Sequence, residues 1–176
     1  MPRATGTREW AAHSRNIYVG CANDCTYCYA KAMAIRFGRK TADSWKAMEL
    51  QPAALRKTTK TGGHIMFPTT HDITPAVADT CISYLEKLLC AGNELLIMSK
   101  PHYECVVRMC DAFADYKDQI LFRFTIGSAN DEVLKLWEPG APSYLERVKA
   151  LQYAFRVGFN TSVSCEPMLD FEIGKV

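Results

Sequence analysis

The chain has 176 residues, of which 48% are hydrophobic and 23% charged, and its formal net charge at pH 7 is +2. This length lets a single domain bury a core, and the composition excludes a disordered chain and a strongly basic nucleic-acid-binding arm. No apolar run could span a bilayer and residues 1–16 lack the apolar core of a signal peptide, so we expect a cytoplasmic protein without membrane contact.

Strand-like and helix-like segments alternate along the chain. Strands are predicted at 16–20, 64–70, 94–100, 120–127 and 159–167. Helices are predicted at 29–37, 75–89, 102–116 and 143–158, the second capped by Thr74 and the last ended by Gly158. This βαβα order predicts a parallel sheet with helices outside it. Residues 38–51 show no clear pattern, and a lid, a loop and a short helix all stay open there.

The segment 120–127 alternates between two strand faces with a period of two. We expect its apolar face to pack on helices, and this face carries Ile120, Phe122, Phe124 and Ile126. Arg123 and Thr125 then point to the opposite side, which in a curved parallel sheet is a barrel interior or a site.

Charged residues stand at the carboxyl ends of three predicted strands. Lys100 ends the third strand, Asp72 follows the second, and Glu166 ends the fifth. Because (β/α) folds place their chemistry at this end of the strands, the three positions are candidates for a site.

The eight cysteines fall into a cluster and a dispersed set. Cys21, Cys25 and Cys28 form a C-x3-C-x2-C motif between a predicted strand and a helix, which favours metal binding or catalysis over disulfides. Structural zinc and ferredoxin-type clusters take four protein ligands, so zinc here would need a distant ligand such as His13. Three thiolates instead suit a cubane cluster with one open iron. The dispersed cysteines are interpreted as small core residues: Cys81, Cys90, Cys105, Cys110 and Cys165.

The C-x3-C-x2-C motif after a first strand resembles the cluster motif of the radical S-adenosylmethionine (radical SAM) enzymes. The resemblance implies a [4Fe-4S] cluster on the three cysteines, with SAM bound at the open iron. It implies an enzyme that reductively cleaves SAM to a 5′-deoxyadenosyl radical, which takes hydrogen from a substrate, and an electron donor such as a flavodoxin or ferredoxin. The implied fold is α/β, a partial (β/α) barrel of the TIM type, in one domain over residues 1–176.

Longer stretches narrow the resemblance to the spore photoproduct lyase-like branch. They are "YVGCANDCTYCYAKAM", "IMSK" and "FTIGSANDEVLKLWEPGAPSYLERVKALQYAFRVGFNTSVSCEPML", and the matches run from about Asn16 to Leu169. The EPGAPS-x3-R part of the third stretch is more specific than the cysteines alone. The branch is named for an enzyme that reverses a thymine photoproduct in DNA, so a nucleic-acid lesion is one implied substrate class. Membership does not establish that activity.

The resemblance also implies contacts to SAM. Lys100, in "SK" at the end of the third strand, would contact the SAM carboxylate, with a solvated surface lysine as the alternative. Thr70, or its neighbours Thr69 and Asp72, would hold the methionine amino end; a turn role is the alternative for Thr70.

Further site residues follow from the same matches. Thr125 and Ser128 fit the position that meets the ribose or methionyl group, with capping of the following helix as the alternative. Tyr27 and Tyr29 match tyrosines that shield the cluster or pass a hydrogen atom. Glu138, in "WEPGAP", is interpreted as part of a rigid turn and left out of the site.

Two departures from the branch bear on the substrate. Spore photoproduct lyases carry a hydrogen-donating cysteine near the end of the second strand, where this chain has "FPTTHD"; Cys165 is the possible substitute. The chain stops at Val176, so we expect a barrel truncated after the fifth strand, as a fragment or completed by another chain.

Two rival functions remain at this point. A non-catalytic iron–sulfur protein for electron transfer or sensing predicts a fourth protein ligand and no SAM binding. A zinc-stabilised nucleic-acid-binding module predicts a colourless protein with stoichiometric zinc. Because the net charge is low, any contact with nucleic acid would need a local patch such as Arg36, Arg39 and Lys40.

Overall fold

A parallel sheet of five strands organises the part of the chain that the computed structural model describes, residues 6–170. The strand order is β1-β4-β5-β6-β7, and every neighbouring pair is parallel. The strands are β1 (His13–Ser14), β4 (Ile65–Phe67), β5 (Leu95–Ser99), β6 (Ile120–Thr125) and β7 (Asn160–Ser164). The predicted α/β class, a partial (β/α) barrel, is confirmed.

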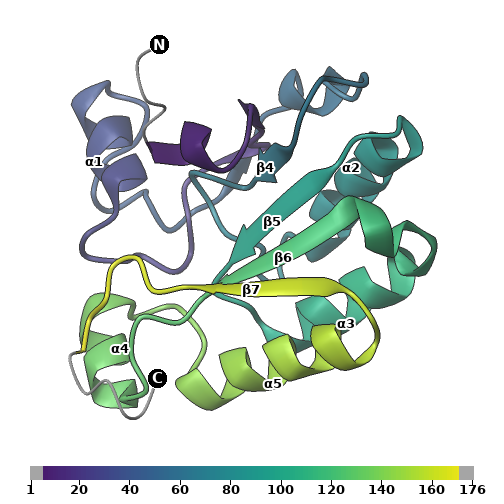
Figure 1. Ribbon diagram of the computed structural model, residues 1–176. Coiled ribbons are helices and arrows are strands. Elements are labelled where there is room, and N and C mark those ends of the chain that lie inside the picture. The colour runs from purple at the N-terminus through teal and green to yellow at the C-terminus, as the bar shows by residue number, and fades with distance from the viewer. Residues whose placement is uncertain (1–5, 171–176) are drawn as a thin grey trace.

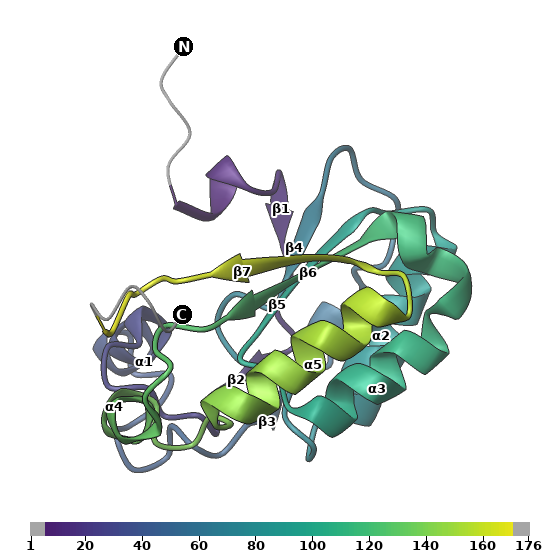
Figure 2. The same ribbon diagram turned by 60° about the horizontal axis from the view of Figure 1, so that its bottom comes forward.

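Helices lie on one face of this sheet and at the carboxyl ends of its strands. The α-helices are α1 (Tyr29–Arg36), α2 (Ala78–Cys90), α3 (Tyr103–Ala112), α4 (Asp131–Trp137) and α5 (Tyr144–Arg156). Short 3-10 helices are η1 (Gly6–Glu9), η2 (Ala54–Arg56) and η3 (Ala114–Gln119). Figure 2 shows α2, α3 and α5 below the sheet and the segment containing η1 above it. In Figure 1 the arrowheads of β5, β6 and β7 point toward α1 and α4.

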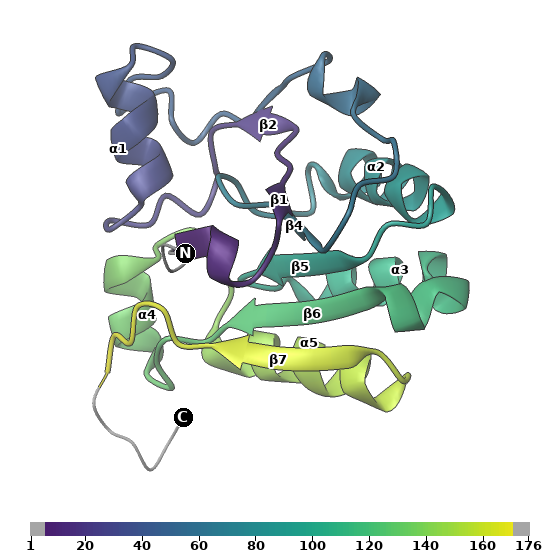
Figure 3. The same cartoon turned by 45° about the horizontal axis from the view of Figure 1, so that its top comes forward.

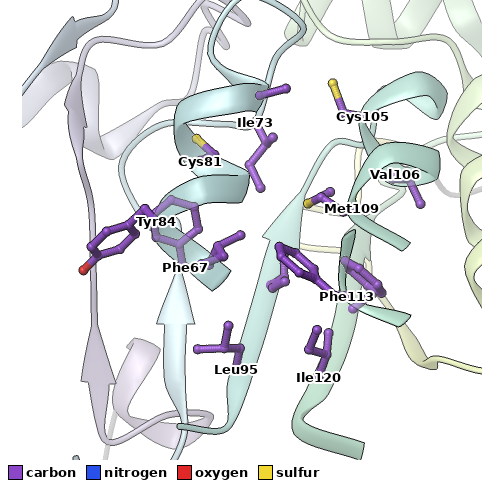
Figure 4. Close-up of a cluster of buried hydrophobic side chains, with 14 of the residues drawn as sticks. Phe67, Ile73, Cys81, Tyr84, Leu95, Cys105, Val106, Met109, Phe113 and Ile120 are labelled. Carbon is purple, nitrogen blue, oxygen red and sulfur yellow. The ribbon is translucent and has the colours of Figure 1, made fainter. Parts of the chain in front are cut away.

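The main core lies between the sheet and α2, α3 and α5 (Figure 4). Side chains with a period of two along three neighbouring strands enter it, as predicted for 120–127: Ile65, Phe67, Leu95, Ile97, Ile120, Phe122 and Phe124. The alternate residues face the other way, where Met66 and Leu96 pack with Ala11 in a small apolar cluster. On this second face Arg123 lies over the Trp10 ring, 3.9 Å from its centroid, and donates a hydrogen bond to Ser162. The sheet therefore separates an apolar helical side from a partly polar interior side.

The first predicted strand is wrong in its pairing. Tyr18–Val19 forms β2, which pairs antiparallel with β3 (Glu49–Leu50) in a separate two-stranded sheet. Figure 3 shows β2 apart from the row of β5, β6 and β7. The backbone N–H of Ile17 donates to the His71 ring at 3.3 Å and its carbonyl accepts from Gln51, so neither group is free for β4. The parallel sheet begins instead at β1.

Helix ends differ from the predictions in two places. Thr74 does not cap α2 with its side chain; the residue before the helix is Val77, whose N–H donates to the Thr74 carbonyl. The predicted third helix ends at Ala112, because Phe113 leaves the helical region at φ -107 and ψ 21, and the chain continues as η3. The last helix begins as its sequence suggests, since Ser143 accepts a hydrogen bond from the N–H of Glu146.

Three of the dispersed cysteines, Cys81, Cys105 and Cys110, are buried in the main core as predicted. Cys90 is exposed, so its prediction as a core residue is wrong. It is the last residue of α2, directly after the buried pair Leu88 and Leu89, and falls on the outward side of the helix. Within residues 6–170, no helix is both long enough and apolar enough to cross a bilayer.

Candidate cofactor site

A cavity of about 370 Å³ lies at the carboxyl ends of β4, β5 and β6. It collects every predicted site residue except Ser128: Cys21, Cys25, Tyr27, Cys28, Tyr29, Thr70, Asp72, Lys100 and Thr125. A larger hollow of about 760 Å³ lies beside α3 and α5 and contains none of them. The smaller cavity is therefore the candidate site.

The loop that carries the three cysteines is shaped by tight backbone contacts. Gly20 has φ +99, and a Cβ there would stand 2.4 Å from the Ala47 carbonyl oxygen, so a side chain would strain both backbone and packing. The Cys21 N–H donates to the Trp45 carbonyl at 3.0 Å. Cys28 ends the loop and caps α1, because its Sγ accepts from the Lys31 N–H at 3.4 Å. The end of the loop and the start of the helix are thus set together.

Asp72 ties this loop to the sheet. Its carboxylate accepts from Asn23 at 2.8 Å and from the Ser99 hydroxyl at 2.5 Å. It also accepts from the backbone N–H groups of Lys100, at 2.9 Å, and Ile73, at 2.7 Å. Four donors therefore hold a carboxylate that is itself buried, and Asn23, which the sequence did not single out, is one of them.

Lys100, whose backbone N–H donates to Asp72, lines the cavity with a side chain that is 15% exposed. Its Nζ is 3.7 Å from Glu138 Oε1 and 5.7 Å from the centroid of the Tyr27 ring. Burial, the largest influence, lowers its pKa, but Cys25, when deprotonated, and the carboxylates of Glu138 and Asp72 together hold the pKa above 10.5. Lys100 is therefore a cation at the cavity wall.

Glu138 and Arg147 are charged residues of this region that the sequence interpretation left out. Glu138 is 1% exposed and Arg147 is fully buried, and Arg147 Nη2 lies 2.6 Å from Glu138 Oε2. This contact is chiefly ionic, because the two atoms lack hydrogen-bond geometry. The signal in the sequence was the acid and the arginine of the EPGAPS-x3-R stretch, which bracket a proline-containing turn. An interpretation of the turn alone missed their pairing.

The turn that carries Glu138 docks on the cysteine loop. The Thr26 N–H donates to the Trp137 carbonyl at 2.9 Å, and the Gly140 N–H donates to the Asn23 carbonyl at 3.0 Å. A Cβ on Gly140 would stand 2.3 Å from the Ala22 carbonyl oxygen, so only glycine allows this approach. Segments more than a hundred residues apart therefore form one wall of the cavity.

Both tyrosines of the loop are hydrogen-bonded. The Tyr27 hydroxyl donates to Glu138, and burial followed by this hydrogen bond raises its pKa, so the phenol stays protonated. The Tyr29 hydroxyl donates to the Thr69 carbonyl at 2.7 Å, and the residue is 59% exposed. The N–H groups of Thr69 and Thr70 are bound by the Asn16 side chain. Tyr27 is thus turned inward, whereas Tyr29 bridges α1 to the loop after β4.

A sequence profile described as the radical SAM superfamily matches residues 16–171 of this chain. The chain belongs to the radical SAM superfamily. "Uncharacterized protein ORF301" of Acidianus two-tailed virus is 29% identical over 166 residues, which are 87% of this chain and 54% of the viral protein. The chain therefore spans about half the length of this curated relative.

Solved structures of spore photoproduct lyase share the fold of this radical SAM chain. The complex with dinucleoside spore photoproduct has a TM-score of 0.63 at 19% identity, over 93% of this chain and 48% of that one. A mutant with the same dinucleoside has a TM-score of 0.59 at 20% identity, over 87% and 44%. The predicted likeness to this branch is confirmed at the level of fold.

The three cysteines of the radical SAM motif line one common space. Between residues 6 and 170, no three or more His, Cys, Asp or Glu side chains gather closely enough for one metal ion. Thiolates on a cubane each bind a different iron, so they need only face a common space, as Cys21, Cys25 and Cys28 do. Without metal, burial raises the pKa of Cys21 to about 12 and that of Cys25 to about 11, so both start as thiols.

Other sequence predictions fall outside the cavity. Ser128 is buried, accepts from the Asn130 N–H at 2.9 Å and donates to Asp170, an arrangement that favours its role at the start of α4. Cys165 is half-buried and does not line the cavity, although its neighbour Glu166 does. The proposed cationic patch is wrong, because Lys40 is buried and pairs with Glu49 at 2.6 Å.

Proposed function

We propose that this chain is a radical SAM iron–sulfur enzyme whose cavity holds a [4Fe-4S] cluster and SAM. The observation that carries the proposal is the convergence of three motif cysteines, a largely buried lysine and a buried carboxylate on one cavity, in a chain of this superfamily. When bound, the two cofactors would supply reductive cleavage of SAM and a 5′-deoxyadenosyl radical that takes hydrogen from a substrate.

Cys21, Cys25 and Cys28 would hold the cluster as thiolates. Because burial raises the pKa of Cys21 and Cys25, binding must release their protons, and assembly should become more favourable as pH rises. The Lys100 cation lies beside Cys25 and lowers the cost of that charge. The cavity supplies no fourth cysteine from the described residues, which leaves one iron for a cofactor ligand.

Lys100 would bind the carboxylate of SAM. Its side chain is largely buried, and none of its ammonium donors forms a hydrogen bond to another residue in 6–170, so these donors can serve a ligand in the cavity. Asp72 would favour the amino group through its negative charge while its oxygens keep the cysteine loop attached to β5. Thr70 and Thr125 would lie beside the methionyl and ribose part of SAM.

The partners of this proposal are SAM and a one-electron donor such as a flavodoxin or ferredoxin. The fold likeness to spore photoproduct lyase supports a nucleic-acid lesion as the substrate class. We expect a lesion other than the thymine photoproduct, because the segment after β4 carries Thr69 and Thr70 and no hydrogen-donating thiol. A tyrosine of the loop, Tyr27 or Tyr29, would then be the hydrogen-atom carrier.

Anaerobic reconstitution with iron and sulfide tests the proposal. We expect about four irons and four sulfides per chain, a change in the electron paramagnetic resonance spectrum of the reduced cluster on addition of SAM, and release of 5′-deoxyadenosine under reduction. Stoichiometric zinc in a colourless protein would support the nucleic-acid-binding module instead. A cluster whose spectrum does not change on addition of SAM would support the non-catalytic electron-transfer or sensing protein instead.

A further inference from the structure

Glu138 and Arg147 form a buried ion pair directly behind the cavity wall. Glu138 follows α4, and Arg147 lies in the first turns of α5. Burying two charges is costly unless they are paired and hydrogen-bonded, and apolar residues in their place often give the fold equal or greater stability. A pair in this position therefore calls for a role beyond packing.

The Glu138 carboxylate has two differently occupied oxygens. Oε2 faces Arg147 Nη2 at 2.6 Å. Oε1 faces the site: it accepts from the Tyr27 hydroxyl and lies 3.7 Å from Lys100 Nζ. One carboxylate thus connects a buried cation with the two site residues whose functional atoms stand at the cavity wall.

Arg147 cannot follow a movement of that carboxylate. Its Nε donates to the Pro142 carbonyl at 2.9 Å, and its Nη1 donates to the Thr125 carbonyl at 3.2 Å. These bonds attach the guanidinium to the turn before α5 and to the end of β6. Glu138 is therefore held from behind by a rigid cation while its other oxygen points to the site.

Lys100 has no comparable partner elsewhere in the described chain. The other nearby carboxylate, Asp72, already accepts four hydrogen bonds, none of them from Lys100 Nζ. At 3.7 Å from Glu138, the ammonium is attracted without spending a hydrogen-bond donor. Its donors are kept toward the cavity, an arrangement that reduces the ordering cost of binding an anionic group.

We propose that Glu138, anchored by Arg147, is the positioning residue of this site, placing the Lys100 ammonium and the Tyr27 hydroxyl for the carboxylate end of SAM. The inference rests on the proposed function and deepens it. Glu138 acts through Lys100 and Tyr27 and does not itself touch the ligand. Because Glu138 acts on SAM through Lys100, replacing Glu138 must have little effect on SAM affinity once Lys100 has been removed.

A double-mutant cycle on SAM affinity tests this dependence. Equilibrium dialysis of SAM against the reconstituted chain should show about 10-fold weaker binding for Glu138→Gln and about 10- to 100-fold weaker binding for Lys100→Met. In the Lys100→Met background, Glu138→Gln should add less than about 3-fold. Glu132→Gln, at an exposed position in the first turn of α4, is the matched control and should change nothing.

An equal loss of affinity from Glu138→Gln in both backgrounds would overturn the inference, since it would mark a general structural effect. If Glu138→Gln does not fold because Arg147 is left unpaired, the double variant Glu138→Gln/Arg147→Met removes both charges and takes its place in the cycle. Affinity equal to the parent in that double variant would also overturn the positioning role.

Thermal unfolding of the metal-free chain separates this inference from the proposed function. If Glu138 pairs with Lys100, Lys100→Met should lower the melting temperature in the parent background and raise it in the Glu138→Gln background, where Lys100 has lost its Glu138 partner and is repelled by the unpaired Arg147. Absence of SAM binding by the parent would overturn the proposed function, while this coupling would still report the pairing. Lys100→Met shifts of the same sign and size in both backgrounds would overturn the pairing.

Discussion

The helix-covered face of the sheet and the cavity at its carboxyl end each contain three cysteines, in different surroundings. The core set is Cys81, Cys105 and Cys110, and the cavity set is Cys21, Cys25 and Cys28. Burial raises the pKa of all three core thiols, to about 12, and it does the same for Cys21. Burial therefore does not distinguish the two sets.

The neighbouring side chains distinguish the two sets of cysteines. The core thiols belong to the apolar cluster between the sheet and its helices, whereas the cavity thiols share one space with Lys100. The same contrast holds for the two regions as a whole. The core depends on many similar apolar contacts, and the cavity depends on a few polar contacts, each made by one residue.

The largest expected difference is in iron content, when one cysteine of each set is replaced by alanine. Cys25→Ala should abolish the brown cluster after anaerobic reconstitution, because the cavity holds no replacement thiol among the described residues. Cys110→Ala should retain it, with only a loss of stability from a smaller core side chain. Iron content and visible absorbance measure both. Full iron content in the Cys25→Ala protein would refute the assignment.

Replacing one aromatic residue tests how much the core packing contributes to the free energy of unfolding. Phe122 is fully buried and packs against the rings of Phe124 and Phe159. Phe122→Ala should lower the free energy of unfolding by about 3–5 kcal/mol. Tyr29→Phe, which removes one hydroxyl bond at an exposed residue of the cavity, should cost about 1 kcal/mol. Urea unfolding of the metal-free chain compares them, and similar losses would contradict the contrast.

Acid should weaken the cavity region through His71. Burial lowers its pKa from 6.5 to about 4, although the Nδ1 contact with the Asp72 carbonyl and the Asp72 charge oppose the shift. The other ring nitrogen accepts from the Ile17 N–H, so the folded chain holds the neutral ring. The unfolded chain then binds a proton that the folded chain does not, so stability is full above pH 6.5 and falls toward pH 4. The loss is about 3 kcal/mol at about 1.4 kcal/mol per pKa unit.

The matched variant for this pH dependence is His71→Gln, whose amide can donate and accept without titrating. Between pH 6.5 and 4 it should lose less stability than the parent, as measured by unfolding at each pH. Identical pH profiles for the two proteins would remove His71 as the cause.

A smaller effect is expected for Lys100→Ala. Loss of a charge-assisted hydrogen bond costs roughly 1.5–3 kcal/mol, so SAM affinity should fall by about one to two orders of magnitude. The cluster should survive, because Lys100 is not a ligand in the proposed site. Dialysis of SAM and iron analysis on the same sample separate the two effects, and unchanged affinity would exclude Lys100.

The smallest expected signal is repair of the thymine photoproduct itself. Incubation of the reduced, reconstituted chain with SAM and a dinucleotide photoproduct should give 5′-deoxyadenosine without repaired thymidine, because the three cavity cysteines are all assigned to the cluster. Chromatography quantifies both products in one reaction. Multiple repair turnovers per chain would show that a thiol hydrogen donor after β4 is dispensable.

Features that depend on neighbours in sequence were predictable. The spacing of Cys21, Cys25 and Cys28 and the period of two in β6 follow from local geometry, and so does the placement of Lys100 at a strand end. Parallel strands share one carboxyl edge, so local order along β4, β5 and β6 was enough to bring Asp72, Lys100 and Thr125 to the same cavity.

Features that depend on contacts between distant segments were decided only by the tertiary structure. Glu138 looked like a turn residue until Arg147 and Tyr27 were found on its two oxygens. The segment 16–20 has strand character, but the His71 ring and the chain at 49–51 occupy its hydrogen-bonding groups, which leaves the parallel position to β1. Local periodicity sets which way a side chain points along its own element, whereas the partner of a buried charge or an edge backbone group is set by the packing of other elements against it.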